Sequence, residues 1–307
     1  MPAWLGPEGK QVNRMVENII FSITAYFTDK IPRIPLGRWT DQAIEFLQIH
    51  CRDSTKAISD FLEIMIKGLQ EGLISIPILL MILAVAAVAW KSAGRKVAIF
   101  SLAGLLFIWN IGLWNVTMQT LAMVLAAVFM CILLGVPLGI LMAKNLTAYR
   151  IIAPVLDFMQ TLPAFVYLLP AIPFFGLGVV PAVITTLIFA MPPVIRLTYL
   201  GLIQVPEELM ELGKSFGSTF FQMLFKIELP LARSTIMAGI NQCIMLSLSM
   251  VVIAAMIGAK GLGGVVWTAI QTLNMGMGFE AGVAIVILAI ILDRITSSLG
   301  NSQGKEG

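Results

Sequence analysis

Long runs without a charged residue dominate this sequence and restrict what it can fold into. No Asp, Glu, Lys or Arg occurs from Val97 to Ala143. As an α-helix this run would be roughly 70 Å long, more than twice the ~30 Å hydrocarbon core of a bilayer. Only 12% of the residues are charged, against about a quarter in soluble domains. The sequence therefore predicts an all-α polytopic membrane protein, because backbone polar groups inside a bilayer must be satisfied within helices.

The uncharged runs divide into about seven expected spans. The run from Val97 to Ala143 must cross twice, with its turn at Asn110–Asn115, because Trp favours the membrane interface and Asn favours turns. A stretch at Ala281–Leu292 is short and needs Met277–Glu280 or Ile295–Leu299 to complete a crossing. The other expected spans are Leu73–Trp90, Val155–Phe175, Val179–Leu202 and Ser234–Ala259.

The basic residues predict an orientation. Beyond residue 72 there are twelve Lys and Arg residues, and with seven spans all but Lys260 fall on one face. The positive-inside rule makes that face cytoplasmic, with the N-terminus outside and the C-terminus inside. Residues 1–72 are then an extracytoplasmic segment with amphipathic helices, lying on the membrane surface or packed on the spans. Residues 300–307 form a cytoplasmic tail.

Enzymatic and nucleic-acid functions find little support. The sequence has no P-loop, HExxH or GxSxG motif and one histidine, His50. We therefore expect no catalytic residue, no metal site and no cofactor bound by the chain. A net charge of +3 without a run of Lys or Arg argues against nucleic acid. An ion-coupled carrier usually keeps ionisable groups at the bilayer midplane, whereas Asp157, Arg196 and the Asp293–Arg294 pair lie at expected span ends, as interfacial or capping charges.

The segment 205–230 predicts a helix, a turn and a second helix. Pro206 followed by Glu207 and Glu208 is typical of a helix start, because carboxylates favour the positive end of the helix dipole. Gly217 can adopt the left-handed conformation that ends a helix, and Ser218 can cap the next. Pro230 is expected to stop the second helix.

The second of these helices has an apolar stripe. Phe220, Met223, Leu224 and Ile227 recur at i, i+3, i+4 and i+7. A helix with such a face can fit a groove on a soluble partner. Packing of the loop against its own helix bundle explains the same pattern.

The spacing in this segment resembles a known signature. Glu211-Leu212-Gly213, Gly217 and Ile227-x-Leu229-Pro230 resemble E-A-A-x3-G-x9-I-x-L-P, the EAA motif of permease subunits of ATP-binding-cassette (ABC) importers. Leu212 and Gly213 depart from its two alanines. Stretches such as LDFMQTLPAFVYLLPAIPFFGLG and LSLSMVVIAAMIGAKGLGG are similar to the glycine betaine/proline betaine (ProU-type, quaternary amine) subfamily. The resemblance runs from about Gly72 to Leu299, with weaker similarity near Ile34–Trp39.

The resemblance implies a transport subunit rather than an enzyme. Its fold would be a type I ABC importer permease (MetI-like) core over 115–299, after two accessory helices over 73–114. In a bacterial inner membrane, it would import glycine betaine, proline betaine or related osmoprotectants. The implied partners are a cytoplasmic ATPase that uses ATP and Mg, an extracytoplasmic solute-binding protein, a second permease copy forming a homodimer, and membrane lipid. An ABC permease for another small solute and an ion-coupled secondary carrier are the alternatives.

Two groups of residues are candidates for function. Segment 205–230 would couple the permease to the ATPase. Its candidate residues are Glu207, Glu208, Glu211, Gly213, Gly217, Phe220, Ile227, Leu229 and Pro230. Aromatic faces suit a quaternary ammonium group, so Phe165, Tyr167, Phe174 and Trp267 are candidates for the substrate path, with packing or interface anchoring as the alternative reading.

Overall fold

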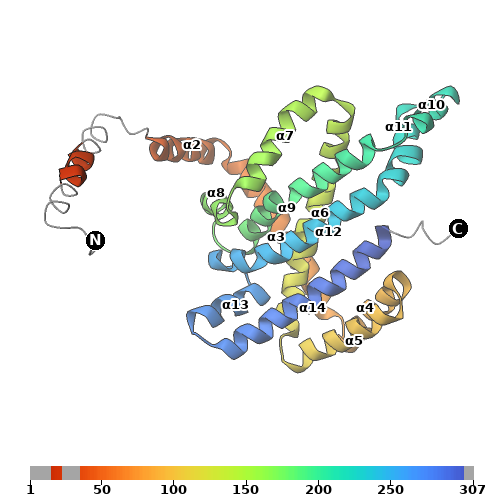
Figure 1. Cartoon of the computed structure of the whole chain (residues 1–307). Helices are drawn as coiled ribbons and strands as arrows, with labels where there is room; N and C mark the ends of the chain where they lie inside the picture. Colours follow the sequence, from red (N-terminus) through yellow and green to blue (C-terminus); the bar gives the residue numbers. More distant parts are fainter. Residues whose placement is uncertain (1–14, 23–34, 301–307) are drawn as a thin grey trace, which may run out of the picture. The chain divides into compact units, whose positions relative to one another are not determined.

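The computed structural model describes residues 15–22 and 35–300. Backbone contacts divide the chain into two units, Met1–Ile49 and His50–Gly307. Residues 15–22 are helical, and α2 (Leu36–His50) follows them. All the candidate residues lie in the second unit (Figure 1). Most of the expected C-terminal tail, together with Ile34 at the start of the weaker resemblance, lies outside the described residues.

The second unit is built from helices. No strand occurs among the described residues, so the all-α prediction is confirmed. The helices are α3 (Arg52–Ser75), α4 (Ile78–Ala93), α5 (Arg95–Asn110), α6 (Trp114–Lys144), α7 (Leu146–Thr161), α8 (Leu168–Phe175), α9 (Val179–Ile203), α10 (Glu207–Ser215), α11 (Phe220–Met223), α12 (Leu229–Ala254), α13 (Leu262–Gln271) and α14 (Met275–Gly300). Short 3₁₀ segments, Ala164–Tyr167 and Ala255–Ile257, and a π turn, Leu224–Glu228, complete them.

The described helices give fewer candidate spans than the seven expected. By length and composition four helices can cross a membrane, or six if each of two bent pairs forms one span. Part of the difference arises in the accessory region, where α4 and α5 have 16 residues each. At ~1.5 Å per residue such a helix is about 24 Å long, short of a ~30 Å core. The turn expected at Asn110–Asn115 is confirmed, because α5 ends at Asn110 and α6 begins at Trp114.

Both bent pairs break at a proline. The expected span Val155–Phe175 is wrong as a single helix, because the axis turns by 111° between α7 and Ala164–Phe175. Likewise, Leu73–Trp90 crosses a 102° bend between α3 and α4. Ile76 and Leu162, which precede Pro77 and Pro163, are extended, with ψ of 130° and 133°. A proline disfavours the helical conformation of the residue before it, which explains both breaks.

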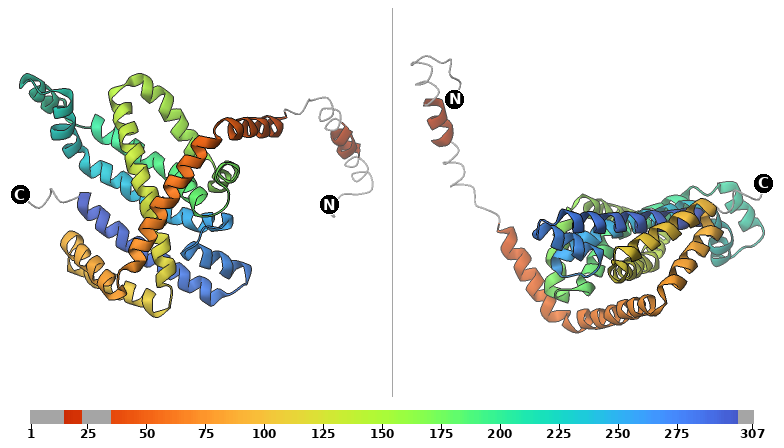
Figure 2. Two further views of the ribbon diagram at one scale, coloured as in Figure 1. Left: turned by 180° about the vertical axis from the view of Figure 1, so that it is seen from behind. Right: turned by 90° about the horizontal axis from the view of Figure 1, so that it is seen from below.

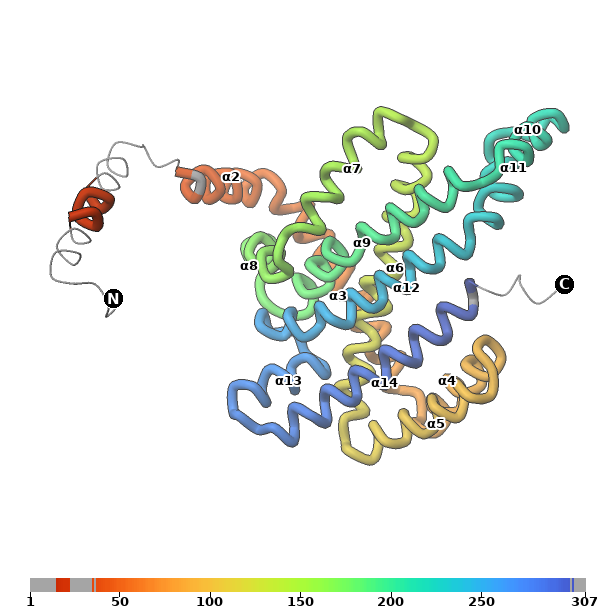
Figure 3. The backbone as a smooth tube through the Cα atoms, viewed as in Figure 1, coloured from red at the N-terminus to blue at the C-terminus, as the bar shows by residue number. Residues whose placement is uncertain are grey.

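Helices α6, α9 and α12 form the core, and small residues let them approach closely (Figures 1 and 3). A Cβ added to Gly139 of α6 would lie 2.6 Å from Thr198 Cβ of α9. A Cβ on Gly239 of α12 would lie 3.0 Å from the carbonyl oxygen of Pro193. Such glycine contacts are typical of membrane helices, which associate by close packing.

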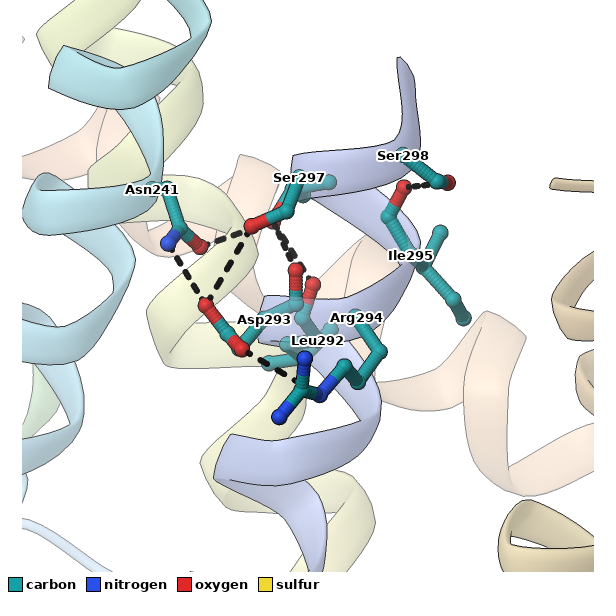
Figure 4. Close-up of polar contacts among 8 residues, drawn as sticks. Asn241, Leu292, Asp293, Arg294, Ile295, Ser297 and Ser298 are labelled. Atoms are coloured by element: carbon teal, nitrogen blue, oxygen red, sulfur yellow. Dashed lines mark hydrogen bonds and ion pairs between the residues drawn. The ribbon is translucent and has the colours of Figure 1, made fainter. Parts of the chain in front are cut away.

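Polar contacts join α14 to α12. Asn241 Nδ2 donates to Asp293 Oδ1 at 2.6 Å, and Thr296 Oγ1 donates to Asn241 Oδ1 at 2.9 Å (Figure 4). Arg294 Nε lies 3.8 Å from the other carboxylate oxygen of Asp293. Asp293, which the sequence predicts to be an interfacial or capping charge, also takes part in an interhelical hydrogen bond.

Helix α3 packs on the core and lies across it when the molecule is seen from behind (Figure 2). It contacts α6, α8 and α9, and its Leu62 and Ile66 are buried. Of the two placements left open for the amphipathic helices of residues 1–72, α3 therefore takes the one packed on the bundle.

Candidate functional site

Helix α10 begins where the sequence predicts. Pro206 occupies the N-cap position and Glu207 and Glu208 lie in the first turn, while Lys214 lies in the last turn. This distribution of charge complements the helix dipole at both ends. The side chains of Glu207, Glu208 and Glu211 are all exposed, so they are available to a partner.

Gly217 forms the turn between α10 and α11. Its φ is +74°, and a Cβ there would meet nothing within 4 Å. The backbone N–H of Ser218 donates to Gly213 O at 3.1 Å, which closes the end of α10. The predicted left-handed glycine is therefore confirmed. The position requires glycine because of its backbone conformation, and not because a side chain would clash with a neighbour.

Thr219, not Ser218, caps the second helix. Thr219 Oγ1 accepts from the N–H of Gln222 at 3.4 Å, and Gln222 Oε1 accepts from the N–H of Thr219 at 2.8 Å. This reciprocal pair is a capping box. The Thr-x-x-Gln pattern was the signal that could have found it.

The expectation that Pro230 stops the second helix is wrong. Helix continues from Phe220 to Ile257, 38 residues, with Leu229 and Pro230 half-buried inside it. A π turn at Leu224–Glu228 comes immediately before α12. A π turn adds a residue to the helical repeat and is one of the local distortions by which a helix accommodates a disruption such as proline. The coupling segment is thus continuous with a membrane span.

Gly213 is the point at which α10 packs on the second helix. A Cβ on Gly213 would lie 2.5 Å from Met223 Sδ and 2.8 Å from Ile227 Cδ1. Met223 and Leu224 are buried, and Ile227 is half-buried. Most of the apolar stripe therefore faces inward, toward α10 and the bundle. The glycine that replaces an alanine of the EAA motif makes room for the two long side chains opposite it.

The exposed apolar face of the loop consists mainly of phenylalanines. Phe216 is 81% exposed, and Phe220, Phe221 and Phe225 are also exposed. Phe220 and Phe221 contact each other edge to face, with centroids 5.5 Å apart. Leu212, which replaces the first alanine of the EAA motif and lies four residues before Phe216, is also exposed. Exposed apolar side chains gathered on one loop are typical of an interaction site, and of these phenylalanines helical periodicity had selected only Phe220.

An ion pair between an exposed lysine and a buried carboxylate anchors the loop to α6. Lys144 Nζ, at the end of α6, lies 2.6 Å from Oε1 and 2.6 Å from Oε2 of Glu228, whose side chain is 2% exposed. Lys144 Nζ also lies 5.7 Å from the centroid of the Phe220 ring. The sequence reasoning missed this contact, because 84 residues separate the two charges.

Comparison with known proteins identifies the family. Residues 135–301, more than half of the chain, match the family described as binding-protein-dependent transport system inner membrane component. The chain belongs to this family. It is a multi-pass inner-membrane transport subunit, and the resemblance to ABC importer permeases is confirmed.

The relatives support the narrower subfamily. The glycine betaine transport system permease protein OpuAB of Bacillus subtilis is 51% identical over 279 residues, which cover 91% of this permease and 99% of the relative. The glycine betaine/proline betaine transport system permease protein ProW of Escherichia coli is 47% identical over 274 residues, which cover 89% of this permease and 77% of the relative. A chain of the inward-facing MetNI methionine ABC transporter matches with a TM-score of 0.58 at 21% identity, covering 62% of this permease and 95% of that chain. The MetI-like fold is therefore confirmed.

The four aromatic candidates for the substrate path do not converge. Phe165 is exposed, whereas Tyr167 is buried and donates its hydroxyl to the carbonyl oxygen of Met159. Phe174 and Trp267 are half-buried on α8 and α13. None of the four lines either cavity described for the permease. Their part in the path stays a prediction.

Proposed function

We propose that this permease is the membrane subunit of an ATP-driven importer of glycine betaine, proline betaine or a related compatible solute. The observation that carries the proposal is a phenylalanine-rich face on a hairpin that continues into the core span α12. The names of the relatives support the solute class. The permease would form the translocation path and bind neither ATP nor Mg, which a separate ATPase would use.

The geometry supports coupling through α12. Closure of the ATPases on ATP would move the hairpin formed by α10 and α11, and the continuous helix would carry that motion into the core. Such rigid-body rocking exchanges inward and outward access. Coupling requires that the hairpin make different contacts in the two states, which an exposed aromatic face allows.

The same proposal sets the orientation. The hairpin would lie in the cytoplasm, in agreement with the placement of the basic residues. An N-terminus outside and a C-terminus inside need an odd number of spans, so α4 and α5 would each have to cross the membrane. A solute-binding protein would dock at the opposite end, which carries the start of α9 and Lys260. A second copy of the permease would complete the path as a homodimer.

Reconstitution tests the proposed function. Purification in mild detergent is expected to recover an ATPase with a P-loop, and proteoliposomes holding both chains and the solute-binding protein should accumulate glycine betaine only with ATP. Accumulation by the permease alone under an ion gradient would instead establish the ion-coupled carrier. Failure to accumulate any quaternary amine with all partners present would contradict the proposed solute class.

Gly217→Val is expected to reduce uptake at least tenfold while leaving membrane insertion intact. Valine at a φ of +74° carries a strain of about 1–2 kcal/mol, which the turn can relieve by moving α10 relative to α11. Uptake and membrane content are measured together. Gly217→Asn is the matched control, because asparagine tolerates the left-handed conformation and should retain most of the uptake. Normal uptake by Gly217→Val would count against a coupling role for this turn.

A further inference from the structure

A cavity of about 450 Å³ lies between α3 and the end of the core opposite the hairpin. Its volume falls in the range of small-molecule sites, about 300–1,000 Å³. On one side it is lined by successive turns of α3, and on the other by residues from α6, from the start of α9 and from the loop before α13. The lining residues are Ser59, Glu63, Ile66, Lys67, Gln70, Glu71, Gln119, Phe175, Leu177, Val179, Val180, Pro181 and Lys260.

The charges of the cavity are separated between its two walls. On the α3 wall, Glu63 pairs with Lys67 at 2.5 Å, which leaves Glu71 as the excess negative charge. The core wall carries Lys260, which forms no ion pair among the residues that the structure describes. The two walls thus have formal charges of −1 and +1, and the lining as a whole is neutral.

The start of α9 adds to the positive wall. Val179 is the first residue of this helix, and no side chain caps its first turn. Uncapped N–H groups at a helix N-terminus favour an anionic group. The N–H of Gly178 donates to Ile257 O at 2.8 Å, and that of Leu262 donates to Thr120 Oγ1 at 2.8 Å. These bonds hold the loop that carries Lys260 between α9 and α6.

Both walls also carry apolar side chains, one of them aromatic. Ile66, Phe175, Leu177 and Val180 contribute this surface. Methyl groups on a quaternary nitrogen are best covered by apolar and aromatic side chains, while a carboxylate needs N–H or ammonium donors. We propose that this cavity binds a small zwitterion, with its quaternary ammonium toward Glu71 and Phe175 and its carboxylate toward Lys260 and the start of α9.

Other ligand classes fit this arrangement less well. A simple cation would meet Lys260, a simple anion would meet Glu71, and an apolar molecule would give neither charge a partner. The inference rests on the proposed function for the location of the cavity, because it is at the external end only if the hairpin is cytoplasmic. There it would receive the solute before the translocation path. It also gives a role to Lys260, the one lysine that departs from the positive-inside pattern.

Direct binding tests the site without transport. The permease is purified with its ATPase in lipid nanodiscs, without solute-binding protein, and glycine betaine binding is measured by saturation-transfer NMR. Tetramethylammonium and pivalate are the probes that lack one charge each. We expect both to bind at least tenfold more weakly than glycine betaine. Lys260→Met and Glu71→Gln should each weaken glycine betaine binding about tenfold, and Lys260→Arg should restore it to within about threefold.

The matched controls are Lys56→Met on α3 and Glu280→Gln on α14. Both residues are exposed and outside the cavity, and binding by these variants should equal that of the parent. The site would be overturned if Lys260→Met bound glycine betaine as tightly as the parent does. It would also be overturned if tetramethylammonium and pivalate bound as tightly as glycine betaine. ATP-driven uptake by the parent complex is measured in parallel. If the parent complex takes up glycine betaine normally and the cavity variants bind it as the parent does, the site alone is rejected. If the parent complex takes up no quaternary amine, the proposed function is rejected, and the NMR binding result still decides the site.

Discussion

Lys144→Met is expected to destabilise the permease by about 1–3 kcal/mol, because it removes the exposed lysine that pairs with the buried carboxylate of Glu228. The π turn that contains Glu228 would then shift toward solvent, and the hairpin would lose its anchor on α6. Thermal unfolding in detergent should show a lower midpoint, and ATP-driven uptake should fall with it. Both measurements are made on the same preparation.

A double variant separates the ion pair from general damage. Lys144→Met combined with Glu228→Met should be more stable than Lys144→Met alone, because the second substitution removes the buried carboxylate that the first leaves unpaired. Lys226→Met is the matched control in the same π turn, and its exposed side chain should contribute less than about 0.5 kcal/mol. Equal stability of the single variant and the parent would show that the pair does not anchor the hairpin.

Gly213→Val is expected to lower uptake more than tenfold, while the ATPase still binds and hydrolyses ATP. A branched side chain at this position must displace Met223 and Ile227, which a Cβ would already approach to 2.5 and 2.8 Å. The contact between α10 and the second helix would open, so motion of α10 would no longer reach α12. ATP hydrolysis and uptake are measured together in proteoliposomes.

Gly213→Ala provides the comparison for this prediction. The added Cβ meets only the ends of the flexible Met223 and Ile227 side chains. The Gly213→Ala variant should therefore retain most of the uptake, as the alanine of the EAA motif suggests. Gly68→Val on α3 is a control for the substitution itself, because a Cβ at Gly68 meets nothing within 4 Å. Loss of uptake in Gly213→Ala, or normal uptake in Gly213→Val, would contradict a packing role for Gly213.

Local rules predicted the turn of the hairpin well. The carboxylates after Pro206 and the left-handed Gly217 follow from the chemistry of helix ends, which depends on neighbouring residues only. The turn between α5 and α6 was predicted for the same reason. The breaks at Pro77 and Pro163, of 102° and 111°, go further than the kinks that prolines within a span predict, because each run without charge was expected to form one span.

The rest of the site depends on packing between distant segments. A helical period shows that Met223, Leu224 and Ile227 share a face, but not that α10 covers it. The pairing of Lys144 with Glu228 requires α6 to end beside the π turn, which no local pattern encodes. Pro230 was misjudged for a similar reason, since a strong local signal was overridden by a distortion of the helix just before it.

The continuous helix from Phe220 to Ile257 can transmit motion from the hairpin to the opposite end of the core. Its 38 residues extend for about 57 Å at ~1.5 Å per residue. If it pivots as a stiff rod near its middle, a tilt of about 10° displaces each end by roughly 5 Å in opposite directions. A push on the phenylalanines at one tip would then swing the far tip the other way, provided that the π turn at Leu224–Glu228 transmits the force.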